Sequence, residues 1–253
     1  MLNPPLHVLQ LTDTHLSADP AATLMGVEVL ASLRRVVAAA RQDCPRPAAV
    51  IATGDLVHDE SAAGYRLLAG TLAALNAPVY CLPGNHDDPA LMRAVLRGSA
   101  ARYADEWVAG RWLLLFLNTA QPGQVAGYLT ARELTRVRES LRRRPGHFAL
   151  LCLHHPPVAI GSPWLDAIAL QNGAELLELV AEHPQVRGVI WGHAHQEYET
   201  EWRGARLFGT PSTCVQFLPG AAHCAADSRP PGYRWLHLHE DGRIDSGVRR
   251  LAL

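Results

Sequence analysis

The chain has 253 residues, of which 48% are hydrophobic and 19% are charged, and its formal net charge is −1. These values suit a soluble globular protein with enough apolar material for a sizeable core. A charge so close to zero argues against a broad binding surface for nucleic acid or for an acidic membrane. We therefore expect neither as a partner, and the sequence leaves open whether the protein is a monomer or a homodimer.

The cysteines and the termini bear on the compartment and on domain organisation. The five cysteines form no Cys-x-x-Cys pair, and their odd number discourages a disulfide framework. No basic segment precedes a long apolar run at the N-terminus, and no run reaches spanning length. A reducing, cytoplasmic location is the resulting expectation. Because no repeat or linker interrupts the chain, residues 1–253 are predicted to form a single domain that is rich in strands from about residue 205.

The first half of the chain alternates short apolar runs with amphipathic segments. Strands are predicted at 7–11, 48–53 and 77–81, and helices at about 23–42, 62–75 and 89–96. The first of these helices is predicted because Leu24, Val27 and Leu30 lie near helical spacing.

The second half continues this alternation and then changes character. Buried strands are predicted at 112–117, 147–153 and 186–191, and helices at 130–143 and 175–182. Near the end, Asp241-Gly242 between apolar runs at 232–238 and 247–251 predicts a β-hairpin. Alternating strands and helices followed by a strand-rich tail predict a layered α/β fold with two sheets.

Five of the apolar runs end in a polar cluster. The clusters are Asp13-Thr14-His15, Gly54-Asp55, Gly84-Asn85-His86-Asp87, His154-His155 and Gly192-His193-Ala194-His195. Any one of them could be an ordinary polar turn or a capped loop. Ligand sites in layered α/β folds lie at the carboxyl ends of strands, however, and five such clusters in succession indicate one shared site.

The residue types in these clusters are those of a metal site. Asp13 and His15 are two residues apart, so in extended geometry both side chains would point the same way and hold one cation. Asp55 can bridge two cations with its two carboxylate oxygens. The candidate ligands in full are Asp13, His15, Asp55, Asn85, His154, His193 and His195. With oxygen and nitrogen donors and no thiolate, they suit two divalent ions such as Fe²⁺, Mn²⁺ or Zn²⁺, which at about 3.5–4 Å apart can activate a water and hold a phosphoryl group.

Taken together, the five clusters resemble the signature blocks of the calcineurin-like metallophosphoesterases, over the stretch from residue 13 to residue 195. The resemblance implies a four-layer αββα sandwich of two mostly mixed sheets flanked by helices. It also assigns the ligands by position. One metal would be bound by Asp13, His15 and His195, the other would be bound by Asn85, His154 and His193, and Asp55 would bridge the two. His86 would sit over the substrate phosphate and stabilise charge or protonate the leaving oxygen.

The second half is similar to the bacterial class III cyclic AMP phosphodiesterases, in blocks at 164–166, 196–197, 210–217 and 231–234. This similarity implies hydrolysis of 3′,5′-cyclic AMP to 5′-AMP by a metal-bound hydroxide, with two divalent ions, Fe²⁺ or Mn²⁺ ahead of Zn²⁺. His86 and Asp55 would be the catalytic residues. The cyclic nucleotide would be bound by His15, Asp55, Asn85, His86 and His195. Whether Trp164 and Phe217 pack the scaffold or line the pocket stays open.

Two other functions remain possible at this point. One is a broad phosphodiesterase for 2′,3′-cyclic nucleotides or glycerophosphodiesters, and the other is a metal-dependent nucleotide-binding protein without turnover. One departure from the wider superfamily also stands out. In the serine/threonine phosphatases an aspartate pairs with the catalytic histidine, and His58 takes that position here. Asp59 and Asp87 are candidates for supporting the ligands, and His155 is expected to be structural.

Overall fold

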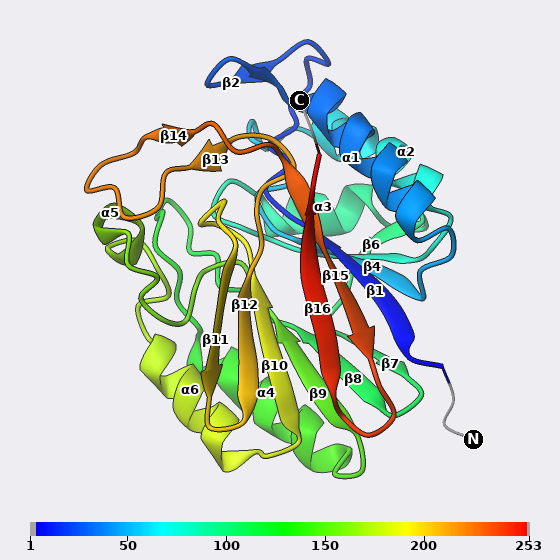
Figure 1. The fold of residues 1–253 in the computed structure, drawn as a ribbon, viewed down its shortest axis with the longest axis vertical. Helices are drawn as coiled ribbons and strands as arrows, with labels where there is room; N and C mark the ends of the chain where they lie inside the picture. Colours follow the sequence, from blue (N-terminus) through cyan, green and yellow to red (C-terminus); the bar gives the residue numbers. More distant parts are fainter. Residues whose placement is uncertain (1–3, 252–253) are drawn as a thin grey trace.

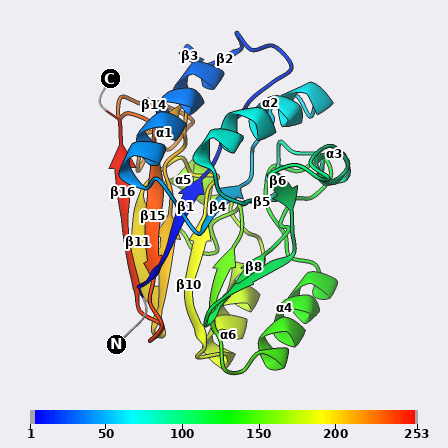
Figure 2. The same ribbon diagram turned by 90° about the vertical axis from the view of Figure 1, so that its right-hand side faces the viewer.

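The computed structural model describes residues 4–251, so the two ends of the predicted 1–253 domain lie outside the described residues. Two six-stranded sheets face each other, and helices pack against the outer face of each (Figures 1 and 2). This order of helix, sheet, sheet and helix confirms the predicted four-layer sandwich. Among residues 4–251, no helix combines the length and apolarity of a membrane span.

The first sheet contains both ends of the described chain. Its strands in spatial order are β16 (Ile244–Arg250), β15 (Gly232–Leu238), β1 (Leu6–Leu11), β4 (Ala49–Thr53), β5 (Val79–Leu82) and β6 (Ala101–Tyr103). The last four are parallel, whereas β15 and β16 are antiparallel. Its helical layer consists of α1 (Val29–Asp43), α2 (Ala62–Leu72), a 3₁₀ turn (Ala73–Leu75) and α3 (Pro89–Val95). The β15–β16 pair confirms the predicted hairpin, although β16 begins at Ile244 rather than at Gly247.

The second sheet is built from the middle of the chain. Its strands in spatial order are β11 (Tyr198–Trp202), β12 (Ala205–Gly209), β10 (Val186–Trp191), β9 (Phe148–Cys152), β8 (Trp112–Phe116) and β7 (Glu106–Ala109). The four central strands are parallel and the two edge strands are antiparallel. The helices α4 (Ala131–Arg143) and α6 (Gly173–Glu182) cover its outer face, and the short α5 (Pro163–Asp166) lies in the loop after β9. A small pair, β13 (Gln216–Phe217) and β14 (Ala226–Asp227), follows β12.

The prediction of a helix over residues 23–42 was wrong at its start. Residues 23–28 form a hairpin of β2 (Thr23–Leu24) and β3 (Val27–Glu28), and α1 begins only at Val29. The two turn residues, Met25 and Gly26, have φ angles of 47° and 85°. A two-residue turn with both residues in the left-handed region matches the twist of a hairpin, so the local turn prevails over the apolar spacing.

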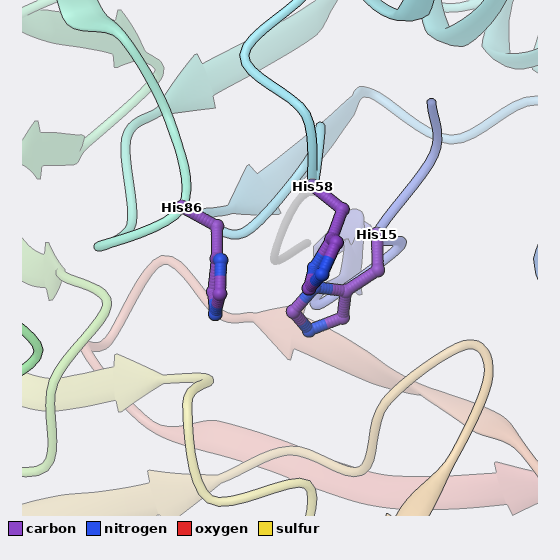
Figure 3. Close-up of side chains that lie close together, drawn as sticks. All are labelled: His15, His58 and His86. Atoms are coloured by element: carbon purple, nitrogen blue, oxygen red, sulfur yellow. The ribbon is translucent and has the colours of Figure 1, made fainter. Parts of the chain in front are cut away.

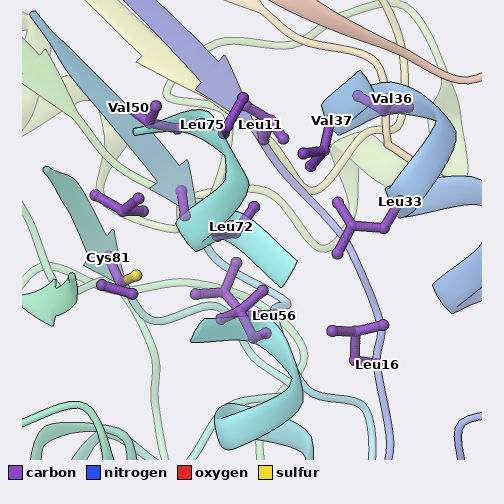
Figure 4. Packing of buried hydrophobic residues seen from close by; sticks show 14 of the residues in the cluster. Leu11, Leu16, Leu33, Val36, Val37, Val50, Leu56, Leu72, Leu75 and Cys81 are labelled. Atoms are coloured by element: carbon purple, nitrogen blue, oxygen red, sulfur yellow. The ribbon is translucent and has the colours of Figure 1, made fainter. Parts of the chain in front are cut away.

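Three apolar cores separate the four layers. Along β1, Val8 packs between the two sheets, whereas Leu9 and Leu11 pack against the helices of the first sheet. Figure 4 shows part of this outer core, in which Leu33 of α1 and Leu72 of α2 approach the sheet. A third core lies between the second sheet and helices α4 and α6. Because the central strands are buried on both faces, the polar clusters begin where these strands end.

Candidate dinuclear metal centre

The structure brings all seven predicted ligands together at the carboxyl ends of five strands. Three strands of the first sheet and two of the second contribute, and the contacts between their loops span up to 180 residues of sequence. The contributing strands are β1, β4, β5, β9 and β10. Each is flanked by parallel neighbours on at least one side, and parallel strands end at the same edge of a sheet.

One group of donors forms around His195. The Nε2 atom of His195 lies 3.4 Å from Oδ1 of Asp13 and 3.2 Å from Nε2 of His15. The Nε2 atom of His15 lies 3.8 Å from Oδ2 of Asp55. These four side chains are all buried, with at most 5% of any of them exposed, and their donor atoms face one another.

A second group forms around Asn85. Its Oδ1 atom lies 3.2 Å from Nε2 of His154 and 3.0 Å from Nδ1 of His193. The same Nε2 of His154 lies 3.3 Å from Oδ1 of Asp55. Asp55 thus presents one carboxylate oxygen to each group, which is the arrangement expected of a bridging ligand.

The hydrogen bonds of the ring nitrogens test whether this centre fits metal ions. Nδ1 of His154 donates to the carbonyl of Thr53 at 2.8 Å, and Nδ1 of His195 donates to the carbonyl of Val215 at 2.7 Å. In the neutral rings the lone pairs therefore lie on Nε2, facing carboxylate oxygens. Acceptors that face acceptors in a buried site need positive charge between them. Two divalent cations fit this requirement.

The pKa values describe the same imbalance of charge. Burial lowers the pKa of His15 to about 3, and it also lowers the pKa of His193, so both rings are neutral. Burial opposes charge on His154 too, but the Asp55 carboxylate raises the pKa of this imidazole to about 9. Burial alone would raise the pKa of Asp13 and Asp55. Their histidine neighbours outweigh it, and both carboxyls stay ionised.

The ligand loops are not extended, contrary to the expectation for the Asp13-x-His15 pair. Nine non-glycine residues in the described chain have positive φ, and five of them are candidate ligands: Asp13, His15, Asp55, His193 and His195. Such residues cost about 1–3 kcal/mol each and persist only where the surroundings hold them. Hydrogen bonds from the amide of Asp13 to Gly54 and from that of His15 to Asp55, each 3.0 Å, hold two of these loops together. The left-handed turns also direct His193 and His195 into different groups.

Asp87 and Asp59 support the centre through backbone amides rather than through ligand side chains. Asp87 accepts hydrogen bonds from the amides of Leu56 at 3.1 Å and Gly84 at 2.9 Å, and so joins the loops after β4 and β5. The hydroxyl of Tyr65 donates to it at 3.0 Å. Asp59 accepts from the amide of Ala18 at 2.8 Å. Both aspartates therefore fix loop positions.

His155 lies beside the centre, and one of its ring nitrogens is close enough to those of His154 and His193 for the three to bind a common metal ion. Both nitrogens are already bonded, however. Nδ1 lies 2.7 Å from Oγ1 of Thr119, and Nε2 lies 2.9 Å from the carbonyl of Val125. These bonds leave no lone pair directed at an ion, so the structure favours His154 over His155 as the ligand.

A cavity of about 220 Å³ opens directly on the centre. His86, His58 and ligands from both groups line it together with mostly apolar side chains. The other lining residues are Leu24, Met25, Val125, Trp164, Leu165, Ile168, Phe217 and Cys224. The rings of Trp164 and Phe217 pack edge to face with their centroids 5.0 Å apart, and the ring of Phe217 stacks on that of His195 with the centroids 4.2 Å apart. Trp164 and Phe217, whose role the sequence left undecided, thus line the pocket. Leu24 and Met25 belong to the hairpin of β2 and β3, which was not predicted from the sequence.

Residues 210–217 hold the first group of donors in place through hydrogen bonds. The hydroxyl of Ser212 donates to the carbonyl of Asp13 at 2.7 Å, and the amide of Thr213 donates to that of Thr12 at 3.1 Å. Together with the Val215 carbonyl, which holds His195, these bonds position both the backbone and a ring of the site. The acceptors in these contacts are backbone carbonyls, which no residue type marks in the sequence.

Residues 6–197 match the family model of the calcineurin-like phosphoesterases, and the chain belongs to this dimetal-dependent family. Among its curated relatives is the 3′,5′-cyclic adenosine monophosphate phosphodiesterase CpdA of Pseudomonas aeruginosa. The two are 39% identical over 246 residues, which cover 96% of this chain and 89% of the relative. CpdA of Escherichia coli K12 is 38% identical over 248 residues, with coverages of 98% and 90%. A crystal structure of a dimetal phosphatase from Danio rerio has the same fold, with a TM-score of 0.72 at 15% identity, and covers 99% of this chain and 100% of that one.

Proposed function

We propose that this protein hydrolyses 3′,5′-cyclic AMP to 5′-AMP at a dinuclear metal centre. The observation that carries the proposal is a single carboxylate, that of Asp55, placed between two groups of donors that are buried except for Asn85, beside a partly apolar cavity. The substrate is supported by the two relatives named as cyclic AMP phosphodiesterases. The free thiols of the five cysteines are consistent with a cytoplasmic reaction.

The proposed ligands divide between the two ions as the donor groups do. Asp13, His15 and His195 would hold one divalent ion, Asn85, His154 and His193 the other, and Asp55 would bridge them. Oxygen and imidazole donors suit Fe²⁺ or Mn²⁺ and also accommodate Zn²⁺. When bound, the ions would polarise the phosphate and lower the pKa of the attacking water.

His86 is proposed to act on the leaving group. Its backbone amide donates to Oδ1 of Asp55 at 2.9 Å, which fixes the loop, and its ring lines the cavity. The attacking water would give up one proton to solvent, and as its oxygen bonds to phosphorus, the bond from phosphorus to the 3′-oxygen would break. A proton from the His86 imidazole would go to that oxygen, leaving a 3′-hydroxyl on 5′-AMP.

The aromatic side chains of the cavity are proposed to receive the adenine ring. Trp164 and Phe217 lie within the same cavity as His86, and Phe217 stacks on His195, so a base stacked there would keep its attached phosphate in the cavity that the centre lines. Aromatic stacking contributes about 1–3 kcal/mol for each nucleobase. This wall would favour a nucleotide over a small diester such as a glycerophosphodiester.

The test is release of 5′-AMP by purified protein reconstituted with Mn²⁺, compared by kcat/KM across 3′,5′-cyclic AMP, 2′,3′-cyclic AMP and glycerophosphocholine. Asp55→Ala should abolish turnover and Mn²⁺ binding. His86→Ala should lower kcat by about 10²-fold or more and leave metal content unchanged. His7→Ala, an exposed histidine at the start of β1, is the matched control. Turnover that survives in Asp55→Ala, or a preference for another diester, would overturn the proposal.

A further inference from the structure

His58 contacts two residues of the proposed centre at once. Its Nδ1 atom lies 3.2 Å from Nδ1 of His15, and its ring stacks on His86 with the centroids 4.6 Å apart and the planes at 24°. Figure 3 shows the rings of His58 and His86 face to face, with His15 beside His58. His58 stands at the position where the serine/threonine phosphatases have an aspartate, so an imidazole here replaces a carboxylate.

The fold holds His58 in place through its backbone. The amide of His58 donates to the carbonyl of Leu16 at 2.7 Å, and the amide of Leu16 donates to that of Leu56 at 3.1 Å. The hydroxyl of Thr14 donates to the same Leu56 carbonyl at 2.6 Å. The segment of His58 therefore runs alongside that of His15 in a fixed register, and the short contact between the two rings follows from it.

The hydrogen bonding of His15 defines what His58 does for it. Nε2 of His15 faces Nε2 of His195 and Oδ2 of Asp55, so this nitrogen carries the lone pair toward a cation and Nδ1 carries the proton. Nδ1 of His58 is the acceptor within reach. His154 and His195 instead donate to backbone carbonyls, which every residue type supplies. His15 relies on a side chain.

The stack on His86 is a separate contact. The backbone of His86 is held by Asp55, but its ring is only half-buried and projects into the cavity. A flat ring at 4.6 Å on one face restricts how that imidazole can rotate. The proton that His86 is proposed to deliver depends on this orientation.

A third metal ion held by His15, His58 and His86 is a competing explanation, because their ring nitrogens lie within 4.8 Å of one another. Such an ion would need a lone pair on Nδ1 of His15 while Nε2 faces the first group. A neutral imidazole has only one. The geometry therefore favours a hydrogen bond over a third ion.

We propose that His58 is a positioning residue with two separable roles. Its Nδ1 accepts a hydrogen bond from the protonated Nδ1 of His15, and the face of its ring orients His86. The proposal rests on the metal centre of the proposed function. It predicts that metal affinity and turnover depend on different properties of one side chain.

Three variants separate these properties. His58→Asn keeps an acceptor near the position of Nδ1 but removes the ring, His58→Phe keeps a flat ring but removes the acceptor, and His58→Ala removes both. Mn²⁺ is titrated into metal-free protein against a competing chelator, and kcat and KM for cyclic AMP are then measured at saturating Mn²⁺. Thermal unfolding of each metal-free variant checks folding, and His7→Ala is the control.

We expect His58→Phe and His58→Ala to weaken one of the two Mn²⁺ sites by about 10–100-fold, and His58→Asn to bind nearly as the unaltered protein does. At saturating Mn²⁺, His58→Asn and His58→Ala should lose about tenfold in kcat at similar KM, and His58→Phe should lose little. Equal losses in all three variants, or a third bound Mn²⁺ that His58→Phe abolishes, would overturn the proposal. Unaltered protein that binds two Mn²⁺ ions without hydrolysing cyclic AMP would refute the proposed function, while the affinity pattern would still support the role of His58 at His15.

Discussion

Removing the metal ions should make the protein lose stability as the pH rises from about 6.5 to about 9. In the metal-free protein, burial disfavours charge on His154, but the Asp55 carboxylate at 3.3 Å raises its pKa from 6.5 to about 9. A pKa raised by folding gives stability that is complete below the unfolded value and is lost as the pH passes the folded value. At about 1.4 kcal/mol for each pH unit, this rise corresponds to about 3 kcal/mol.

Urea unfolding of chelator-treated protein between pH 6 and 9.5 measures this loss. His154→Asn is the matched variant, because it removes the titrating ring while keeping a polar side chain. The difference in free energy of unfolding between the two proteins should shrink by about 3 kcal/mol over this range. Curves that run parallel from pH 6 to 9.5 would show that the His154–Asp55 pair does not carry the charge assigned to it.

Four further results are expected. Binding of Mn²⁺ at pH 8 should release about one proton, from His154, measured by calorimetry in buffers of different ionisation enthalpy, and an identical heat in all buffers would contradict it. Gly84→Ala should weaken Mn²⁺ binding by at least about tenfold in chelator competition, because the new Cβ would lie 2.2 Å from Oδ1 of Asp55. Trp164→Ala should raise KM for cyclic AMP by about tenfold with metal content unchanged. Arg234→Ala should cost about 3 kcal/mol in urea unfolding, because it removes the buried guanidinium donor from the acceptors of Thr210, Gly209 and Ser246.

Much of the proposed ligand set was visible in the sequence because each ligand follows directly on an apolar run. Asp55 comes two residues after the last residue of β4, and His154 comes two residues after the last residue of β9. Parallel strands bring such ends to one edge, so a one-dimensional pattern predicts a three-dimensional cluster. The same pattern did not reveal how the loops turn. Asp13 and His15 meet one group of donors through left-handed residues rather than through an extended strand.

The cavity wall was harder to predict than the donors. Leu24 and Met25 line the cavity only because residues 23–28 form a hairpin before α1. The spacing of the apolar residues in this segment was equally compatible with a helix. The left-handed turn at Met25 and Gly26 favours the hairpin instead. Apolar side chains carry no chemical signature of their own, so their place in a pocket becomes visible only with the fold.

The contacts that hold the ligands in place differ in how strongly they constrain the sequence. Backbone carbonyls orient His154 and His195, so substitutions at Thr53 or Val215 can leave these hydrogen bonds intact. His15 depends on a side chain, and that side chain also stacks on His86. A change at residue 58 is therefore expected to affect the proposed metal binding, the proposed proton delivery or both, according to whether it removes the acceptor, the ring or both, whereas a change at residue 215 need affect neither. Because the two kinds of contact look alike in a linear sequence, a position such as 58 is recognised only once the rings are placed in space.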